Sequence, residues 1–203
     1  MLAKTGWMLM TFLAVINGIE GLRYAMPQAP FPAPLPNFVT RHEWLVGHAV
    51  FSSIALLTGP WQFSRRLRRR SLKVHRWLGR VYCGAVVAGW VTSLPIAAHA
   101  QTGQVASAGF LALGAFWIVT TAIGYRKIRA GQLQAHREWM MRSFALTAAA
   151  ITLRIYLPIV VVTHAPFAAG YSLIAWICWI PNLLLAEWLL RRGRVRTAIA
   201  VAA

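Results

Sequence analysis

Residues 44–76 read WLVGHAVFSSIALLTGPWQFSRRLRRRSLKVHR. Residues 44–63 contain no Asp, Glu, Lys or Arg, and an apolar stretch of this length crosses the hydrocarbon core of a bilayer as a helix. Residues 65–76 then carry seven Lys and Arg. A run of cations at the end of an apolar span is typical of a cytoplasmic loop. The segment therefore predicts a transmembrane helix that ends at the cytoplasmic face.

The composition of the whole chain is that of a protein surrounded by lipid. Of its 203 residues, 58% are hydrophobic and 12% are charged, and the mean hydropathy is +0.55. A soluble domain has about 25% charged residues, so this chain cannot cover a surface that faces water. The net charge of +17 is gathered in short clusters between apolar runs. We therefore expect contacts with a bilayer and its anionic lipids, and no binding of nucleic acid.

The same alternation continues along the chain and predicts an all-α fold, a polytopic membrane helix bundle in a single transmembrane domain, 1–203. About six transmembrane helices are expected, at residues 6–23, 44–63, 77–98, 106–125, 139–163 and 171–190. Lys and Arg concentrate after the second and fourth spans and in the C-terminal tail. By the positive-inside rule, the N- and C-termini are cytoplasmic, and the expected location is the bacterial inner membrane, as a multi-pass protein.

The first apolar run has two interpretations. Lys4 precedes it, as in a cleaved signal peptide. Glu20 and Arg23 close the run, and the Pro-rich residues 27–36 follow, with no clear small-residue cleavage site directly after it. These features favour a retained span.

Four polar side chains lie within the expected spans at similar depth, in the half of the membrane away from the cytoplasm. They are Asn17, Glu20, His48 and Arg154. Ionisable groups at such a depth face the bundle interior and need partners. We therefore expect a buried Glu20–Arg154 pair beside His48 and Asn17. The cluster fits either a static ion pair or a polar cavity that serves a proton or a substrate. Near the cytoplasmic face, Glu187 is expected to pair with Arg80 or Arg142.

Two histidines occupy equivalent places in a weak internal repeat. His75 and His136 each follow a basic loop, precede an Arg, and begin the third and fifth spans. Helical periodicity places further small and polar residues on the same faces: Gly79, Tyr82, Val86, Gly89 and Ser93 with His75, and Ser143, Thr147 and Arg154 with His136. The two faces are expected to point at each other across the bundle.

Two facing imidazoles are the usual axial ligands of a b-type haem in a helix bundle. Four arginines beside them would suit the haem propionates: Arg76, Arg80, Arg137 and Arg142. The alternative is that His75 and His136 are interfacial residues with their polar tips among the lipid headgroups.

Several motifs resemble a bacterial family of predicted membrane proteins, domain of unknown function 2306. They are LTGPWQF at 57–63, HRWLGRVY at 75–82, HREWMMRS at 136–143, TLR at 152–154 and WIPNL at 179–183. The resemblance covers roughly residues 45–190. It implies a multi-span membrane protein and no established activity.

The start of the third span, His75-x-x-Leu78-Gly79, is also similar to the six-helix cytochrome b proteins that carry electrons from ascorbate across membranes. This similarity implies that His75 and His136 hold the cytoplasmic haem of that family. His48 matches one ligand of the second haem, but the fourth span contains no histidine for the other. The similarity therefore extends to one haem only.

Two hypotheses for function follow. The first is a membrane redox protein that binds one haem b between His75 and His136 and exchanges electrons with a quinone or a redox partner. The second is a cofactor-free protein, a transporter-like or assembly-factor membrane protein, whose main feature is the polar cluster of Glu20, His48 and Arg154. No motif of a soluble enzyme is present, and whether the chain is an enzyme stays open.

Overall fold

The computed structural model describes residues 4–26, 40–100 and 102–202, with only the helical backbone of Lys4 and of 195–202. The described residues form helices and no strand, so the expected all-α membrane bundle is confirmed. The Pro-rich residues 27–36 lie outside the described part, as does the side chain of Arg196 in the basic tail. The helices are α1 (Lys4–Leu22), η1 (Arg23–Ala25), α3 (His42–Gln62), α4 (Arg65–Arg70), α5 (Leu72–Ala98), α6 (Gln104–Arg129), α7 (Leu133–Thr147), α8 (Ala149–Val162), α9 (Phe167–Ile177) and α10 (Ile180–Ala202).

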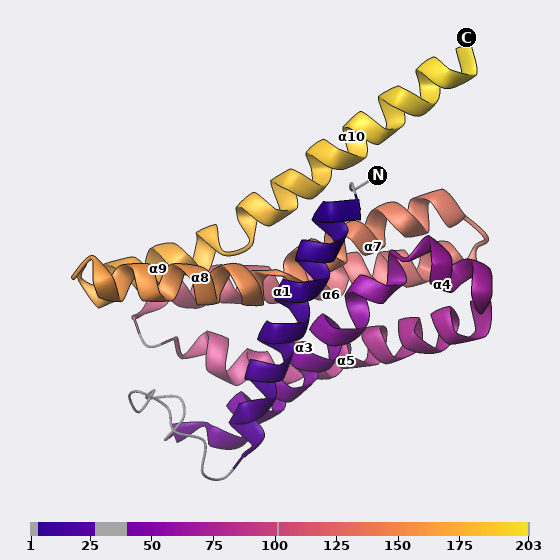
Figure 1. The fold of residues 1–203 in the computed structure, drawn as a ribbon. Helices are drawn as coiled ribbons and strands as arrows, with labels where there is room; N and C mark the ends of the chain where they lie inside the picture. The colour runs from indigo at the N-terminus through magenta and orange to yellow at the C-terminus, as the bar shows by residue number, and fades with distance from the viewer. Residues whose placement is uncertain (1–3, 27–39, 101, 203) are drawn as a thin grey trace.

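Short connections fold successive helices back on one another (Figure 1). Helix α3 packs against α5 and α1, and α6 packs against α5, α7 and α9. The α3–α5 connection through α4 and the α6–α7 turn near Gly131 lie at one end of the bundle, where Lys and Arg are dense. We call this the basic end, and the other the far end.

The two ends of the described chain both approach the basic end. Trp7 in the second turn of α1 donates from Nε1 to the carbonyl of Pro60, near the end of α3, at 3.1 Å. Arg194 in α10 bonds to Glu138 near the start of α7. Trp7 and Arg194 therefore both lie at the basic end.

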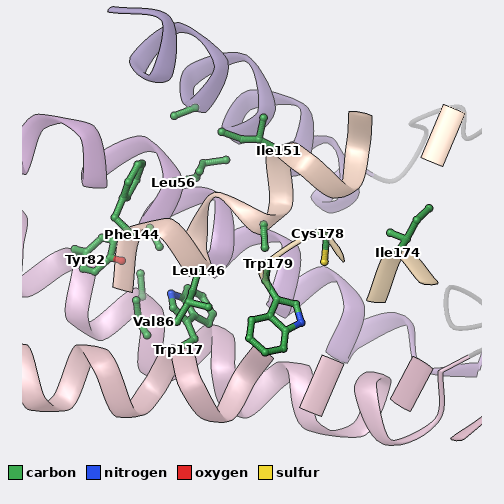
Figure 2. Packing of buried hydrophobic residues seen from close by; sticks show 14 residues of the cluster. Leu56, Tyr82, Val86, Trp117, Phe144, Leu146, Ile151, Ile174, Cys178 and Trp179 are labelled. Carbon is green, nitrogen blue, oxygen red and sulfur yellow. The ribbon is translucent and has the colours of Figure 1, made fainter. Parts of the chain in front are cut away.

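The interior is a continuous cluster of buried apolar side chains from α1, α3, α5, α6, α7, α8 and α9. Figure 2 shows it extending from Tyr82 and Phe144 past Trp117 to Cys178 and Ile174. Small residues permit the close packing. A Cβ on Gly109 would lie 2.8 Å from the carbonyl oxygen of Ala175, so α6 and α9 approach each other closely at that point.

The outside of the bundle is apolar, as expected for a surface in lipid. Phe12, Leu184 and Val162 are among its most exposed large side chains, with exposed fractions of 61%, 63% and 75%. In water such a surface would be an aggregation hazard, whereas in a bilayer it is the ordinary outer face of a helix.

Five helical stretches in the described chain are long and apolar enough to cross a membrane: Thr5–Ala25, Leu72–Ala98, Gln104–Arg129, Leu133–Val162 and Phe167–Arg194. Helix α3 is not among them, although it has 21 residues. His48, Ser52, Ser53 and Thr58 lower its hydropathy. At 1.5 Å per residue it is about 31 Å long, which matches a hydrocarbon core of about 30 Å. The expectation of about six spans therefore depends on α3.

The last two expected spans are each divided into two helices, which the sequence analysis did not foresee. Helices α7 and α8 meet at Ala148, where the N–H of Ile151 bonds to the Ala148 carbonyl in a tighter turn. Helices α9 and α10 meet at Cys178 and Trp179. Pro181 follows this break and has no N–H to donate back into α9.

Candidate functional site

The two repeat histidines lie at the basic end, where α5 and α7 begin. Each imidazole is half-buried, and the two are close enough for their charges to interact. The Nδ1 atom of His136 lies 2.8 Å from the carbonyl oxygen of Gly124 on α6. Because a carbonyl only accepts, Nδ1 donates this hydrogen bond, and in the neutral form of the ring the lone pair is then on Nε2.

His75 is held by Gln62, the last residue of α3. With its amide oriented to satisfy its neighbours, Gln62 donates from Nε2 to Nδ1 of His75 at 3.0 Å and to the His75 carbonyl at 3.2 Å. Its Oε1 accepts from the N–H of Gly79 at 3.3 Å. The reverse orientation would place the amide oxygen against the His75 carbonyl and the NH2 group against the N–H of Gly79, so Gln62 donates to Nδ1 and the proton of the neutral His75 ring lies on Nε2.

Arginines surround the histidine pair. The charges of Arg68, Arg76 and Arg137 act on His75. Arg68 is fixed, because its Nη1 donates to the Gln62 carbonyl at 2.6 Å. The pKa of Arg68 lies below its usual value, mainly because the side chain is partly buried and then because Arg137 and Arg65 lie nearby.

The four arginines proposed from the sequence for propionate binding differ in their surroundings. Arg76, Arg80 and Arg137 are exposed at this end of the bundle. Arg142 instead binds the carboxylate of Glu187 through Nε and Nη2, with 3.1 Å between Nη2 and Oε2. Glu187 thus has one of its two expected partners, and the Nε and Nη2 donors of Arg142 are used by this carboxylate. The role expected for Arg142 in propionate binding stays a prediction.

A second ion pair joins the same two helices. Glu138 on α7 accepts from Nε and Nη2 of Arg194 on α10, and from Nε2 of Gln134 at 3.0 Å. Helix α7 thus supplies one carboxylate and one guanidinium, and α10 supplies the complement. The sequence analysis missed the role of Glu138, although its spacing of four residues from Arg142 places both on one face of a helix.

A network of buried hydroxyl groups lies two helical turns deeper than the histidines. The hydroxyl of Tyr82 on α5 lies 2.7 Å from Oγ of Ser143 and 2.7 Å from Oγ1 of Thr147, both on α7. From α6, Trp117 donates Nε1 to Thr147 at 2.8 Å, and Thr121 lies 2.7 Å from Ser143. The contacts of Tyr82 confirm that the two expected helix faces meet, whereas the contribution of α6 was not foreseen.

The polar cluster predicted in the other half of the membrane is only partly assembled. Glu20 pairs with Arg23, one turn along the chain, at 2.6 Å rather than with Arg154. Asn17 donates to the Leu13 carbonyl in its own helix. These two findings correct the expected Glu20–Arg154 pair and the place of Asn17.

Arg154 lies at the junction of α8 with α1 and α3. The turn at Ala148 interrupts the helix, so Arg154 does not share a continuous helical face with His136. Its Nη1 donates to the Ala150 carbonyl at 3.1 Å, and no carboxylate of the described residues lies within ion-pair distance. Arg154 nevertheless lies close enough to Glu20 and to His48 to interact electrostatically with each of them.

His48 forms part of the contact between α3 and α5. Its Nδ1 donates to the Gly89 carbonyl at 2.9 Å, and the Ser52 hydroxyl lies 3.4 Å from both ring nitrogens. Within the described part of the chain, every buried polar side-chain atom has a hydrogen-bond partner, and no group of three or more His, Cys, Asp or Glu is placed to hold a metal ion.

Comparison with known proteins identifies the family. A family model described as predicted membrane protein (DUF2306) matches residues 45–190. No curated protein and no solved structure matches the chain. The matched region extends from α3 to α10 and contains the histidine pair, the hydroxyl network and the Arg142–Glu187 ion pair. The chain therefore belongs to the DUF2306 family of predicted membrane proteins.

Proposed function

We propose that this protein is a membrane-embedded electron carrier that holds one b-type haem between His75 and His136. The observation that carries the proposal is the state of His136, whose Nδ1 is committed to the Gly124 carbonyl and whose Nε2 is free. Metal-binding histidines have this arrangement, because the outer hydrogen bond fixes the tautomer and orients the ring.

His136 fits haem iron through Nε2, and His75 would be the second imidazole ligand, as in helix-bundle cytochromes. In the structure Gln62 donates to Nδ1 of His75, so haem binding through Nε2 would require Gln62 to release Nδ1 and the His75 ring to change its tautomer. When bound, the haem would supply one-electron redox chemistry at this end of the bundle.

The charges around the pair also suit a haem. Arg76, Arg80 and Arg137 carry no carboxylate partner within the described residues and would be charge-assisted donors to the two propionates. Arg68 has no such freedom, because it is bound to the Gln62 carbonyl.

The dense Lys and Arg of the basic end support a cytoplasmic position for it by the positive-inside rule. Both termini then face the cytoplasm, from a bacterial inner membrane with anionic lipids around its loops. A quinone in the bilayer or a redox protein at the membrane surface would exchange electrons with the site.

The test is the haem content of the full-length protein purified in detergent from haem-replete cells. A pyridine haemochrome assay is expected to give about one haem per chain for the wild type, and a reduced-minus-oxidised spectrum of the b type. His136→Ala and His75→Ala should each lose most of the haem. The matched control is His99→Ala, because His99 is exposed at the far end and bonds to Pro95 in its own helix.

Two results would overturn the proposal. One is a colourless wild-type protein that is monodisperse and helical by circular dichroism. The other is a coloured protein whose haem content is unchanged in both His136→Ala and His75→Ala.

A second candidate is a cofactor-free, transporter-like or assembly-factor protein that works at the far end. The specific observation in its favour is Arg154, a largely buried guanidinium that has no carboxylate at ion-pair distance among the described residues. Such a group can serve as the binding point for an anionic ligand. This second candidate predicts a colourless protein. Arg154→Gln is expected to abolish its function, whereas His75→Ala and His136→Ala are expected to retain it. Function is scored by growth complementation of a deletion strain.

A further inference from the structure

The connection between α3 and α5 is a structured helix rather than a loose loop. Ser64 caps α4 by accepting from the N–H of Leu67 at 3.2 Å, and Ser71 caps α5 by accepting from the N–H of Val74 at 3.3 Å. Arg68 turns inward to the carbonyl of Gln62. The two caps and this bond fix which way the remaining side chains of α4 point.

Arg66, Arg69 and Arg70 of α4 are exposed. Lys73, Arg76 and Arg80 continue the exposed cations along the first turns of α5. The sequence has no Asp or Glu between Glu43 and Glu138, so this segment has no carboxylate of its own.

The carboxylates at the same end of the bundle do not compensate these charges. Glu138 is bound to Arg194, and Glu187 is bound to Arg142. Like charges this dense repel one another, so the segment requires counter-anions from outside the protein.

Apolar side chains flank the cations and define their depth. Trp61 and Trp77 are 42% and 60% exposed, and Leu72 and Val74 are exposed as well. Tryptophan prefers the boundary between headgroups and acyl chains. With these side chains at the boundary, the guanidinium groups of α4 lie at the level of the lipid phosphates.

We propose that α4, with Lys73 at the start of α5, forms a binding site for the phosphate headgroups of anionic phospholipids. The planar guanidinium group of arginine presents paired donors that match phosphate oxygens, and most of the exposed cations here are arginines. The site rests on the proposed cytoplasmic orientation and does not require a haem.

The test compares two variants that each lose three cations. Arg66→Gln, Arg69→Gln and Arg70→Gln together remove charge from α4. Arg126→Gln, Lys127→Gln and Arg129→Gln together remove the same charge from the end of α6, at the same end of the bundle. Each full-length protein is reconstituted in nanodiscs of phosphatidylcholine with phosphatidylglycerol, extracted gently, and its retained lipids are quantified by mass spectrometry.

The wild type is expected to retain phosphatidylglycerol at least threefold over its share of the bilayer. The α4 variant should fall close to the bulk ratio, and the α6 variant should keep most of the enrichment. Equal loss in both variants would show a response to net charge alone and would overturn the site. So would a wild type with no enrichment.

A measurement on the unmodified protein guards against misfolding of the α4 variant. A photoactivatable phosphatidylglycerol is expected to crosslink within residues 61–77, and crosslinks confined to other segments would contradict the site. The haem assay on the same samples separates the two proposals, because loss of lipid selectivity leaves haem content unchanged.

Discussion

The two ends of the bundle handle their charges differently. At the basic end, Glu138 and Glu187 on two different helices are each bound by an arginine from the other helix. At the far end, Glu20 is bound by Arg23 in the next turn of the same segment, and among the described residues Arg154 bonds to the Ala150 carbonyl of its own helix rather than to a carboxylate.

The difference indicates what each end can do. Ion pairs between α7 and α10 fix how these helices are placed relative to each other, and they position the start of α7, where His136 lies. A pair within one turn fixes nothing between helices, so the far end keeps a cation that is available to a ligand. Between the two ends, the network around Tyr82 contains only neutral groups.

Removal of one partner at the basic end should have the largest effect. Glu187→Leu leaves Arg142, whose side chain is 14% exposed, without its carboxylate. We expect the free energy of unfolding to fall by about 3 kcal/mol, measured by denaturation in mixed micelles. The double change with Arg142→Leu should recover most of this loss. A double variant as unstable as Glu187→Leu would show that the pair itself is not responsible.

Packing beside the hydroxyl network gives the next effect. A Cβ on Gly59 would collide with the ring of Phe144 on the neighbouring helix. Gly59→Ala is therefore expected to cost about 2 kcal/mol of unfolding free energy in the same assay. The control is Gly84→Ala, because a Cβ there meets nothing within 4 Å and alanine favours a helix. Equal changes in unfolding free energy for Gly59→Ala and Gly84→Ala would contradict the close contact between Gly59 and Phe144.

The network of buried hydroxyl groups is tested by Tyr82→Phe. The substitution removes the hydroxyl that lies 2.7 Å from both Ser143 and Thr147, and each of these keeps another partner on α6. We expect a loss of about 1 kcal/mol in unfolding free energy, typical of hydrogen bonds between membrane helices. Tyr125→Phe, at an exposed position, should change nothing measurable. A loss above about 3 kcal/mol would indicate a cooperative network rather than separate bonds.

The smallest effect is expected at the far end. The carboxylate of Glu20 belongs to a side chain that is 46% exposed, so Glu20→Gln should cost about 0.3 kcal/mol. In double-mutant cycles, Glu20 should couple to Arg23 and show almost no coupling to Arg154. A coupling to Arg154 of about 1 kcal/mol or more would show that the pair expected from the sequence forms in solution.

The fold class was predictable because lipid imposes a strong rule on sequence. Apolar runs about 20 residues long can only be helices when no water is available to the backbone, and cation-rich loops mark the ends. The breaks at Ala148 and at Cys178 were not predictable. Nothing in the residues around Ala148 signals a helix end, and the effect of Pro181 depends on where α9 stops.

The candidate site was predictable only to the level of helix faces. Periodicity placed Tyr82 below His75 and Ser143 below His136, and the hydrogen bonds of Tyr82 confirm that these faces meet. The partner of each polar side chain was harder to predict from the sequence, because it depends on how each helix is rotated and tilted. Glu20 therefore selects Arg23 rather than Arg154, and α6 contributes Trp117 without any sequence signal.

The central claim is that the two imidazoles of His75 and His136 share one haem. Near-infrared magnetic circular dichroism of the oxidised, purified protein reports the axial ligands of haem iron directly. We predict the charge-transfer band of low-spin ferric haem with two imidazole ligands, and its loss in His136→Ala. A protein without haem absorption, or a band from any other pair of ligands, would contradict the account.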